Sequence, residues 1–217
     1  MSRCESFSDL IFWSHRLAQE TLQPGDLAVD LTVGHGRDSL HLAQCVDSRH
    51  QGTVLGFDIQ SQAIENSLAQ LENEGIPACR ISRPQQVQAA GVFLTETCHA
   101  RLSLFLPRAP KVVMANLGYL PGGDHRLVTR AETTCAALEQ ALEELVAGGR
   151  LILVVYRRHE GGKEESQAVD RLLQGLNPNQ WDVLRLDPFN RQQAPYLLVA
   201  EKKQTSPKGA AKFFLKK

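Results

Sequence analysis

The chain has 217 residues, 42% of them hydrophobic, which is enough for one domain with a well-buried core and too few for two. Its 24 basic residues balance its 24 acidic residues, so no overall charge draws the protein to nucleic acid or to an anionic membrane. Any RNA substrate would therefore have to be held by a local patch of basic side chains.

Seven short apolar stretches are predicted as strands. Several of them are continuously apolar, as expected of strands that are buried on both faces of a parallel sheet. The predicted strands are residues 27–32, 53–58, 91–96, 111–116, 150–156, 181–186 and 195–200.

Segments with helical periodicity lie between these strands. Each has apolar residues at spacings of three and four, which gives one stripe for packing on a sheet. The three series are Ile64, Leu68 and Leu71, then Ala131, Cys135, Leu138, Leu142 and Leu145, then Ala168, Leu172 and Leu176. Further helices are expected over residues 12–18 and from near Arg37.

The alternation of strands and helices predicts a doubly wound α/β fold, with a mostly parallel sheet and helices on both faces. The segment LDPFNRQQA between the last two strands is too short for a crossover helix, so these strands should form an antiparallel hairpin at one edge. Residues 75–90 fit no regular element and are predicted as a loop. We expect one domain over residues 1–202 and a basic, disordered tail over residues 203–217.

The cysteines and the N-terminal segment bear on the cellular compartment. The five cysteines are scattered and never spaced C-x-x-C, which argues against a disulfide framework and a structural zinc. The sequence contains no apolar run long enough to span a membrane, and its first residues lack the features of a signal peptide. We therefore expect a cytoplasmic protein with no membrane or metal partner.

The motif DLTVGHGRDS follows the first predicted strand. Gly34 and Gly36 would let the backbone turn tightly and approach a ligand at the carboxyl edge of the sheet. A dinucleotide fingerprint would have a third glycine where Ser39 stands, so a bound pyrophosphate is not specifically indicated. A tight connection without a ligand is the alternative interpretation of this turn.

Four further residues with polar side chains lie at or near strand ends. Asp58 could accept both hydroxyls of an adenosine ribose, or it could cap the helix that begins near Ser61. Asp38 is either part of the site or simply a favourable acid in the first turn of a helix. Cys98 and His99 follow the third predicted strand and should lie at the same edge.

The motif NLGYLPGGDH, residues 116–125, has a spacing that resembles the N-P-P-Y segment of amino-directed methyltransferases. Asn116 could accept a hydrogen bond from an amine, and Tyr119 could lie beside the nitrogen that becomes cationic as it is alkylated. The alternative is an ordinary loop in which residues 121–123 make the turn and Asp124 caps the next helix.

Six motifs together resemble the family once labelled putative rRNA methylases and since associated with tRNA (5-aminomethyl-2-thiouridine) methyltransferase activity. They are DLTVGHGRDSLHLA, GFDIQ, TCHARL, NLGYLPGGDH, YRRHEGGKEESQAV and PYLLVAEK. The resemblance implies a Rossmann-like class I fold, S-adenosylmethionine as cofactor, and methylation of the wobble uridine's aminomethyl nitrogen in the tRNA anticodon stem-loop. It also makes a homodimer a reasonable expectation.

The strand-end pattern and the resemblance together give a predicted cofactor site. Its residues are Asp30, Gly34, His35, Gly36, Asp38, Asp58, Gln60, Cys98, His99 and Asn116. The chain departs from the family pattern at His35, where asparagine is frequent, and at Cys98, where serine or aspartate is frequent.

Methyl transfer from a sulfonium needs a nucleophile held in line with the methyl group, so its catalysis is mostly positioning. A primary alkylamine, with a pKa of about 10.4 as in lysine, is largely protonated at neutral pH. The site must therefore favour the neutral amine or accept its proton. Asp124 and His125 are the predicted proton acceptors, and Asn116 and Tyr119 are predicted to orient the nitrogen.

The motif YRRHEGGK follows the fifth predicted strand and should lie at the same edge. Arg157, Arg158, His159 and Lys163 are predicted to contact anticodon phosphates. Tyr156 and His159 would flank the target base, and a solvated loop is the alternative interpretation of this motif.

Three functional interpretations stand side by side. A tRNA methyltransferase is the leading interpretation. For a methyltransferase, the sequence alone also leaves rRNA, a protein amide or a small amine open as the methyl acceptor. An NAD-linked oxidoreductase on a similar sheet is disfavoured by the missing third glycine. An RNA-binding module without catalysis is disfavoured by the combination of Asp58, Asn116 and Tyr119.

Overall fold

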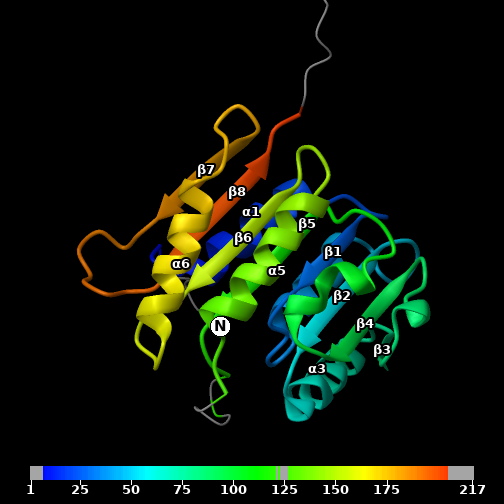
Figure 1. Ribbon diagram of the computed structural model, residues 1–217. Coiled ribbons are helices and arrows are strands. Elements are labelled where there is room, and N and C mark those ends of the chain that lie inside the picture. The colour runs from blue at the N-terminus through cyan, green and yellow to red at the C-terminus, as the bar shows by residue number, and fades with distance from the viewer. Residues whose placement is uncertain (1–6, 121, 123–126, 205–217) are drawn as a thin grey trace, which may run out of the picture.

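The computed structural model describes residues 7–120, 122 and 127–204, and it is built around one twisted sheet (Figure 1). The strands are β1 (Leu27–Asp30), β2 (Thr53–Asp58), β3 (Ala78–Ile81), β4 (Gly91–Glu96), β5 (Val112–Leu117), β6 (Arg150–Val155), β7 (Trp181–Leu186) and β8 (Tyr196–Lys202). Their order across the sheet is β3-β4-β2-β1-β5-β6-β8-β7. The six strands from β1 to β6 pair in parallel, and β8 pairs antiparallel with both β6 and β7.

Helices cover both faces of this sheet. They are α1 (Leu10–Thr21), α2 (Arg37–Cys45), α3 (Ser61–Asn73), α4 (Leu102–Phe105), α5 (Ala131–Glu144) and α6 (Gly162–Gln174), with 3-10 turns at Pro84–Gln86 and His99–Arg101. One hydrophobic cluster joins one face of the sheet to α1, α2 and α3, and a second joins the other face to α4, α5 and α6. No helix of the described residues is long and apolar enough to cross a membrane.

Successive side chains of the central strands point to opposite faces of the sheet, which explains why these strands are continuously apolar. In β5, Val112 and Met114 pack into the cluster beneath α1–α3, whereas Val113, Ala115 and Leu117 pack into the cluster beneath α4–α6. Because successive side chains of a strand point to opposite faces, a sheet covered on both sides needs apolar residues at every position.

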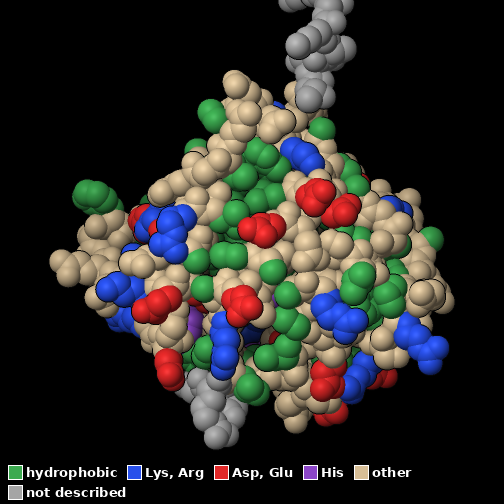
Figure 2. Space-filling model, viewed as in Figure 1, with side chains coloured by type: hydrophobic (Ala, Val, Ile, Leu, Met, Phe, Trp, Pro, Cys, Tyr) green, Lys and Arg blue, Asp and Glu red, His purple; other side chains and the backbone are tan. Residues whose placement is uncertain are grey.

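The face formed by α5 and α6 carries acidic and basic side chains that are mixed together (Figure 2). This mixing agrees with the balanced charge of the whole chain. Mixed charges of this kind give this face no extended positive field.

The predicted α/β fold and its antiparallel edge hairpin are confirmed, but the prediction of seven strands is wrong by one. The eighth strand, β3, lies within residues 75–90, which were expected to form a loop. It is a four-residue edge strand in which only the last residue is buried, and such strands lack the apolar pattern that marks buried ones. The predicted boundary at residue 202 stays a prediction, because most of residues 203–217 lie outside the described part of the chain.

The sheet topology determines where loops meet. From β1 the chain proceeds to β2 on one side, and it later returns to place β5 on the other side of β1. The loops after β1 and β5 therefore flank the position where the strand order reverses, which is where ligands bind in open α/β sheets.

The loop after β1 is held close to α3 by a glycine. Gly36 is the N-cap of α2 with a φ of 78°, a conformation that favours glycine. A Cβ atom at Gly36 would lie 2.9 Å from the Cα, Cβ and Oγ atoms of Ser67 on α3. The same serine hydroxyl donates to the Gly34 carbonyl at 3.0 Å, so the glycine permits a close loop-to-helix contact.

Replacing Gly36 by alanine should destabilise the protein more than the matched change at Gly161. Gly161 is the N-cap of α6 with a φ of 75°, and a Cβ there would have no atom within 4 Å. Both variants should lose about 1 kcal/mol to left-handed strain. Gly36→Ala should lose about 1–3 kcal/mol more, because Ser67 must move. Urea denaturation measures the stability of both variants. Equal losses would contradict the inference that Gly36 is needed for the close contact with Ser67.

Candidate active site

A cavity of about 470 Å³ opens at the carboxyl edge of the sheet, beside the reversal of strand order. Its walls come from the segments that follow β1, β2, β4, β5 and β6. Ten of the residues predicted from the sequence line it: Gly34, His35, Asp38, Asp58, Gln60, Cys98, His99, Asn116, Tyr119 and Tyr156. The structure thus brings together residues that are far apart in the sequence.

Asp58 sits at the end of β2 and holds two loops. Its Oδ2 accepts from the Gly34 amide at 3.0 Å, and its Oδ1 accepts from the Gln60 amide at 2.9 Å. Burial raises the pKa of Asp58, although these backbone donors oppose the rise. The N-cap of α3 is Gln60, so Asp58 is not the cap of that helix. Each carboxylate oxygen has a second lone pair and can accept a further hydrogen bond.

His99 lines the cavity, and one of its ring nitrogens is a hydrogen-bond acceptor. Its Nδ1 lies 3.1 Å from the Leu31 carbonyl, and because a carbonyl only accepts, Nδ1 carries the proton. Burial lowers the pKa of His99, so the ring is neutral at pH 7 and Nε2 carries a lone pair. Nε2 is buried and has no hydrogen-bond partner among the described residues. A ligand hydroxyl or amine could satisfy it.

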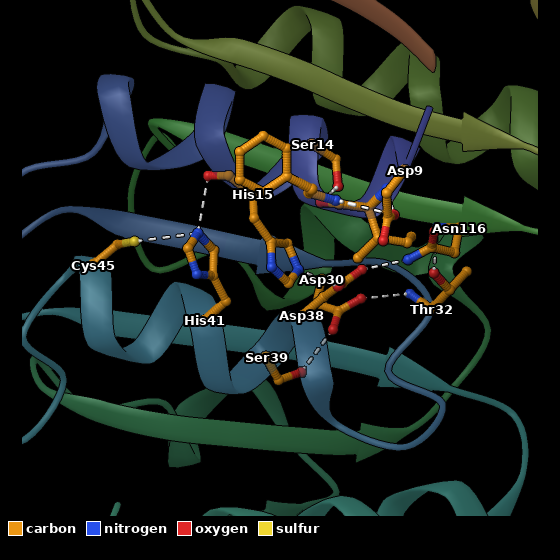
Figure 3. Close-up of polar contacts among 12 residues, drawn as sticks. Asp9, Ser14, His15, Asp30, Thr32, Asp38, Ser39, His41, Cys45 and Asn116 are labelled. Carbon is orange, nitrogen blue, oxygen red and sulfur yellow. Dashed lines mark hydrogen bonds and ion pairs between the residues drawn. The ribbon is translucent and has the colours of Figure 1, made fainter. Parts of the chain in front are cut away.

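Asp38, in the first turn of α2, joins α1 to the end of β5 (Figure 3). Its Oδ1 accepts from His15 Nε2 at 2.7 Å, and its Oδ2 accepts from the side-chain amide of Asn116. The Asn116 backbone amide also donates to Thr32 Oγ1 at 2.8 Å. Three segments of the chain therefore meet at one nearly buried carboxylate.

These contacts determine which way the Asn116 amide faces. An ionised carboxylate can only accept, so the Asn116 nitrogen must point to Asp38 and the Asn116 oxygen must point elsewhere. That Oδ1 atom is buried and has no hydrogen-bond partner in the described part of the chain. Because Asn116 lines the cavity, its free oxygen is suited to a ligand that carries an N–H or O–H donor.

Tyr119 lies on a segment whose two ends are tied together. Tyr119 forms an isolated antiparallel bridge with Val128, and the Thr129 amide donates to the Gly118 carbonyl at 2.9 Å. Tyr119 is 42% exposed and lines the cavity. Of the other residues predicted on this segment, Asp124 and His125 lie outside the described residues.

Six predicted residues do not line the cavity. Two of them, Asp30 and Gly36, belong to the strand and loop of β1. The other four come after the lining residue Tyr156 in the sequence and are Arg157, Arg158, His159 and Lys163. Arg157 donates to the Ala194 carbonyl at 2.6 Å, and Arg158 donates to the Gln192 carbonyl at 3.2 Å. These two arginines hold the β7–β8 loop against the segment after β6. The side chain of His159 is buried.

Several lining residues were not predicted from the sequence. They include Ile11, Arg37, Ile59, Thr97, Leu127, Thr129, Arg130 and Thr133. Ile59 and Thr97 adjoin Asp58 and Cys98, so reading one residue further along each strand end would have found them. Nothing in the local sequence marks His15, whose contact with Asp38 arises only when α1 packs over the sheet. Among the described residues, no cluster of three His, Cys, Asp or Glu side chains could hold a metal ion.

Asp30 is a fully buried acid beneath the site. Its oxygens accept from the Thr32 amide at 3.0 Å and from Ser39 Oγ at 2.7 Å. Burial, followed by repulsion from Asp38, raises the pKa of Asp30 to about 7, against the lowering effect of these two hydrogen bonds. It shapes the loop after β1 from behind and does not face the cavity.

The family model "Putative rRNA methylase" matches residues 54–202. The chain is 33% identical over 202 residues to the chloroplastic tRNA (mnm5s2U34)-methyltransferase of Arabidopsis thaliana, covering 88% of this chain and 68% of that protein. A crystal structure of a putative rRNA-methylase from Clostridium thermocellum matches with 34% identity and a TM-score of 0.80, covering 91% and 100% of the two chains. A putative methyltransferase from Streptococcus mutans in complex with SAH matches with 28% identity and a TM-score of 0.76, covering 91% and 99%.

The raised pKa of Asp30 predicts a specific dependence of stability on pH. The folded state keeps this proton up to a pH of about 7, whereas the unfolded chain releases it near pH 4. Between these values the folded state binds more protons, so its stability falls as pH rises. The free energy of unfolding of the wild type relative to Asp30→Asn should fall by on the order of 2 kcal/mol from pH 5 to pH 7.

Urea denaturation of both proteins at several pH values measures this difference. Asparagine is nearly isosteric with aspartate and keeps an acceptor for the Thr32 amide. A difference that is constant from pH 5 to pH 7, or one that grows with pH, would contradict the raised pKa.

Proposed function

The chain belongs to the family of putative rRNA methylases, and on that premise we propose that it N-methylates the 5-aminomethyl group of the wobble uridine in tRNA. The family and the similar structures establish its general activity: it is a class I methyltransferase whose cofactor is S-adenosylmethionine. The proposal concerns the substrate, the reacting nitrogen and the residues that hold them.

The observation that carries the proposal is the Asn116 side-chain oxygen, which is buried without a hydrogen-bond partner among the described residues, on a residue that lines the cavity. An amine bears N–H donors, and a fixed acceptor can orient it with its lone pair free for reaction. The tRNA substrate is supported by the Arabidopsis relative, which is named a tRNA (mnm5s2U34)-methyltransferase. That name describes the enzyme that acts on a uridine at position 34.

The residues that line the cavity suit the cofactor. When bound, S-adenosylmethionine supplies a methyl group on a sulfonium, which an amine lone pair can attack. We assign Asp58 to the ribose hydroxyls, through the lone pairs that Gly34 and Gln60 leave unused. His99 Nε2, buried without a partner among residues 7–120, 122 and 127–204, offers a second acceptor. Gly34, His35, Asp38, Gln60 and Cys98 complete the proposed cofactor site.

The amine is proposed to lie between Asn116 and Tyr119. Asn116 Oδ1 would accept one amine N–H, which turns the lone pair away from the protein. The Tyr119 ring would stabilise the positive charge that develops on the nitrogen during methyl transfer. Asp124 and His125 stay the proposed acceptors for the proton that the amine must lose.

Cations around the cavity are proposed to contact the RNA backbone. Arg37 and Arg130 line the cavity mouth with exposed side chains. Arg157, Arg158 and Lys163 lie on the segment that continues from Tyr156, and they are proposed to reach anticodon phosphates. The expected homodimer and cytoplasmic location stay predictions.

Replacing Asp58 by alanine should weaken the binding of S-adenosylmethionine and S-adenosylhomocysteine by about two orders of magnitude or more. Two charge-assisted hydrogen bonds, each contributing about 1.5–3 kcal/mol, would be lost from a partly closed site. The matched control is Glu96→Ala, because Glu96 pairs in register with Asp58 on the adjacent strand and does not line the cavity.

Titration calorimetry measures both variants, and thermal melts of the ligand-free proteins show whether the fold survives. Cofactor affinity of Asp58→Ala that matches that of Glu96→Ala would show that Asp58 serves only to hold its two loops.

Nucleoside mass spectrometry tests the proposed substrate. The purified protein is incubated with S-adenosylmethionine that carries a trideuterated methyl group, together with tRNA and rRNA from cells that lack the protein. We expect the label in 5-methylaminomethyl-2-thiouridine from tRNA, with a matching loss of the 5-aminomethyl nucleoside. Label in an rRNA nucleoside, or no label in tRNA, would refute the proposal.

A further inference from the structure

The motif HEGGKEE, residues 159–165, contains a buried histidine–glutamate pair that does not line the cavity. The side chains of His159 and Glu165 are 4% and 0% exposed, and His159 Nε2 lies 3.6 Å from Glu165 Oε2. Neither ring nitrogen of His159 has a hydrogen-bond partner among the described residues. Burying two ionisable side chains is costly, so their position calls for an explanation.

Glu165 connects three parts of the chain. Its Oε2 accepts from Thr129 Oγ1 at 2.7 Å, and its Oε1 accepts from Thr134 Oγ1 at 2.6 Å. Glu165 lies on α6, Thr134 lies on α5, and Thr129 closes the segment that begins with Gly118. Removing a partner from a buried carboxylate leaves it unsatisfied, so these three parts should move together.

Gly162 makes room for the histidine ring. A Cβ atom at this position would lie 2.7 Å from Cε1 and 2.8 Å from Nδ1 of His159. The lack of a side chain therefore allows the ring to fold back over the start of α6, next to Glu165. Any larger residue would push the ring away from its position.

The ring of His159 in turn reaches Tyr119. The two rings are arranged edge to face, with their centroids 6.4 Å apart. The backbone of Tyr119 is tied to the same unit, because Thr129 donates its amide to the Gly118 carbonyl and Tyr119 bridges Val128. Both the ring and the backbone of Tyr119 are therefore linked to the His159–Glu165 pair.

We propose that His159, Gly162 and Glu165 form a positioning unit that holds the Tyr119 ring where it meets the reacting amine. This inference rests on the proposed function, in which Tyr119 stabilises the charge that develops on the nitrogen. None of the three residues lines the cavity, so they act through Tyr119 and Thr129. A small displacement of a residue at the reacting centre is enough to slow a reaction that depends on positioning.

The unit is tested by Gly162→Ala, with Gly175→Ala as the matched control. Gly175 lies at the other end of α6 with a φ of −77°, and an added Cβ there would come no closer than 3.3 Å to another atom. Gly162→Ala should lower kcat for methyl transfer to tRNA by about tenfold to a hundredfold. The KM for S-adenosylmethionine should change by less than about threefold, because the lost interaction acts on the transition state. Gly175→Ala should leave both constants near those of the wild type.

Amide hydrogen exchange by NMR gives a readout that needs no substrate. The Thr129 amide should exchange faster in Gly162→Ala than in Gly175→Ala, because the link between Glu165 and Thr129 is strained. His159→Phe, which keeps a ring but removes both nitrogens, provides a second variant if Gly162→Ala folds poorly. It should also lower kcat without a matching rise in KM.

The outcomes separate this inference from the proposed function. Unchanged kcat in a folded Gly162→Ala or His159→Phe variant would overturn the positioning unit while leaving the function intact. A wild-type protein that does not methylate this tRNA would refute the proposed function. In that case unchanged exchange of the Thr129 amide would overturn the unit as well.

Discussion

The hydrogen bond from the Asn116 amide to the Asp38 carboxylate is the interaction on which the site depends. It joins the end of β5 to the start of α2, across the position where the strand order reverses. A charge-assisted hydrogen bond of this type contributes about 1.5–3 kcal/mol, so it opposes rotation of the Asn116 amide. His15 brings α1 to the same carboxylate, and the Asn116 oxygen is left as a fixed acceptor.

Buried and half-buried carboxylates give the rest of the site its shape. Each of four acids accepts hydrogen bonds from two different residues; the acids are Asp30, Asp38, Asp58 and Glu165. A buried acid that loses its donors is costly, so each one resists the movement of the segments that it holds. The loops are therefore arranged before a ligand binds, which suits a reaction that depends on positioning.

The sheet and much of the cavity could be predicted from the sequence, because their residue patterns have physical causes. Strands buried on both faces must be apolar throughout, and parallel strands end at one edge, so the sequence alone was enough to group Asp58, His99 and Asn116. The edge strand β3 has no such pattern. The role of His15 depends on how α1 packs, and the tethering of Arg157 depends on a carbonyl of the β7–β8 loop. Pairings of this kind arise from tertiary structure and leave no periodic signal.

The side-chain amide of Asn116 offers the most direct measurement of the central claim, that Asp38 fixes its oxygen as the acceptor for the amine. NMR can follow the Asn116 Nδ2 protons and the Cγ carbon in the wild type and in Asp38→Asn. If Asp38 fixes this amide, the Nδ2 protons are protected from exchange in the wild type and lose protection in the variant. An amine substrate, added with S-adenosylhomocysteine, should shift the Cγ signal and leave the Nδ2 protection in place. Unprotected Nδ2 protons in the wild type, or protection that survives in Asp38→Asn, would contradict the central claim.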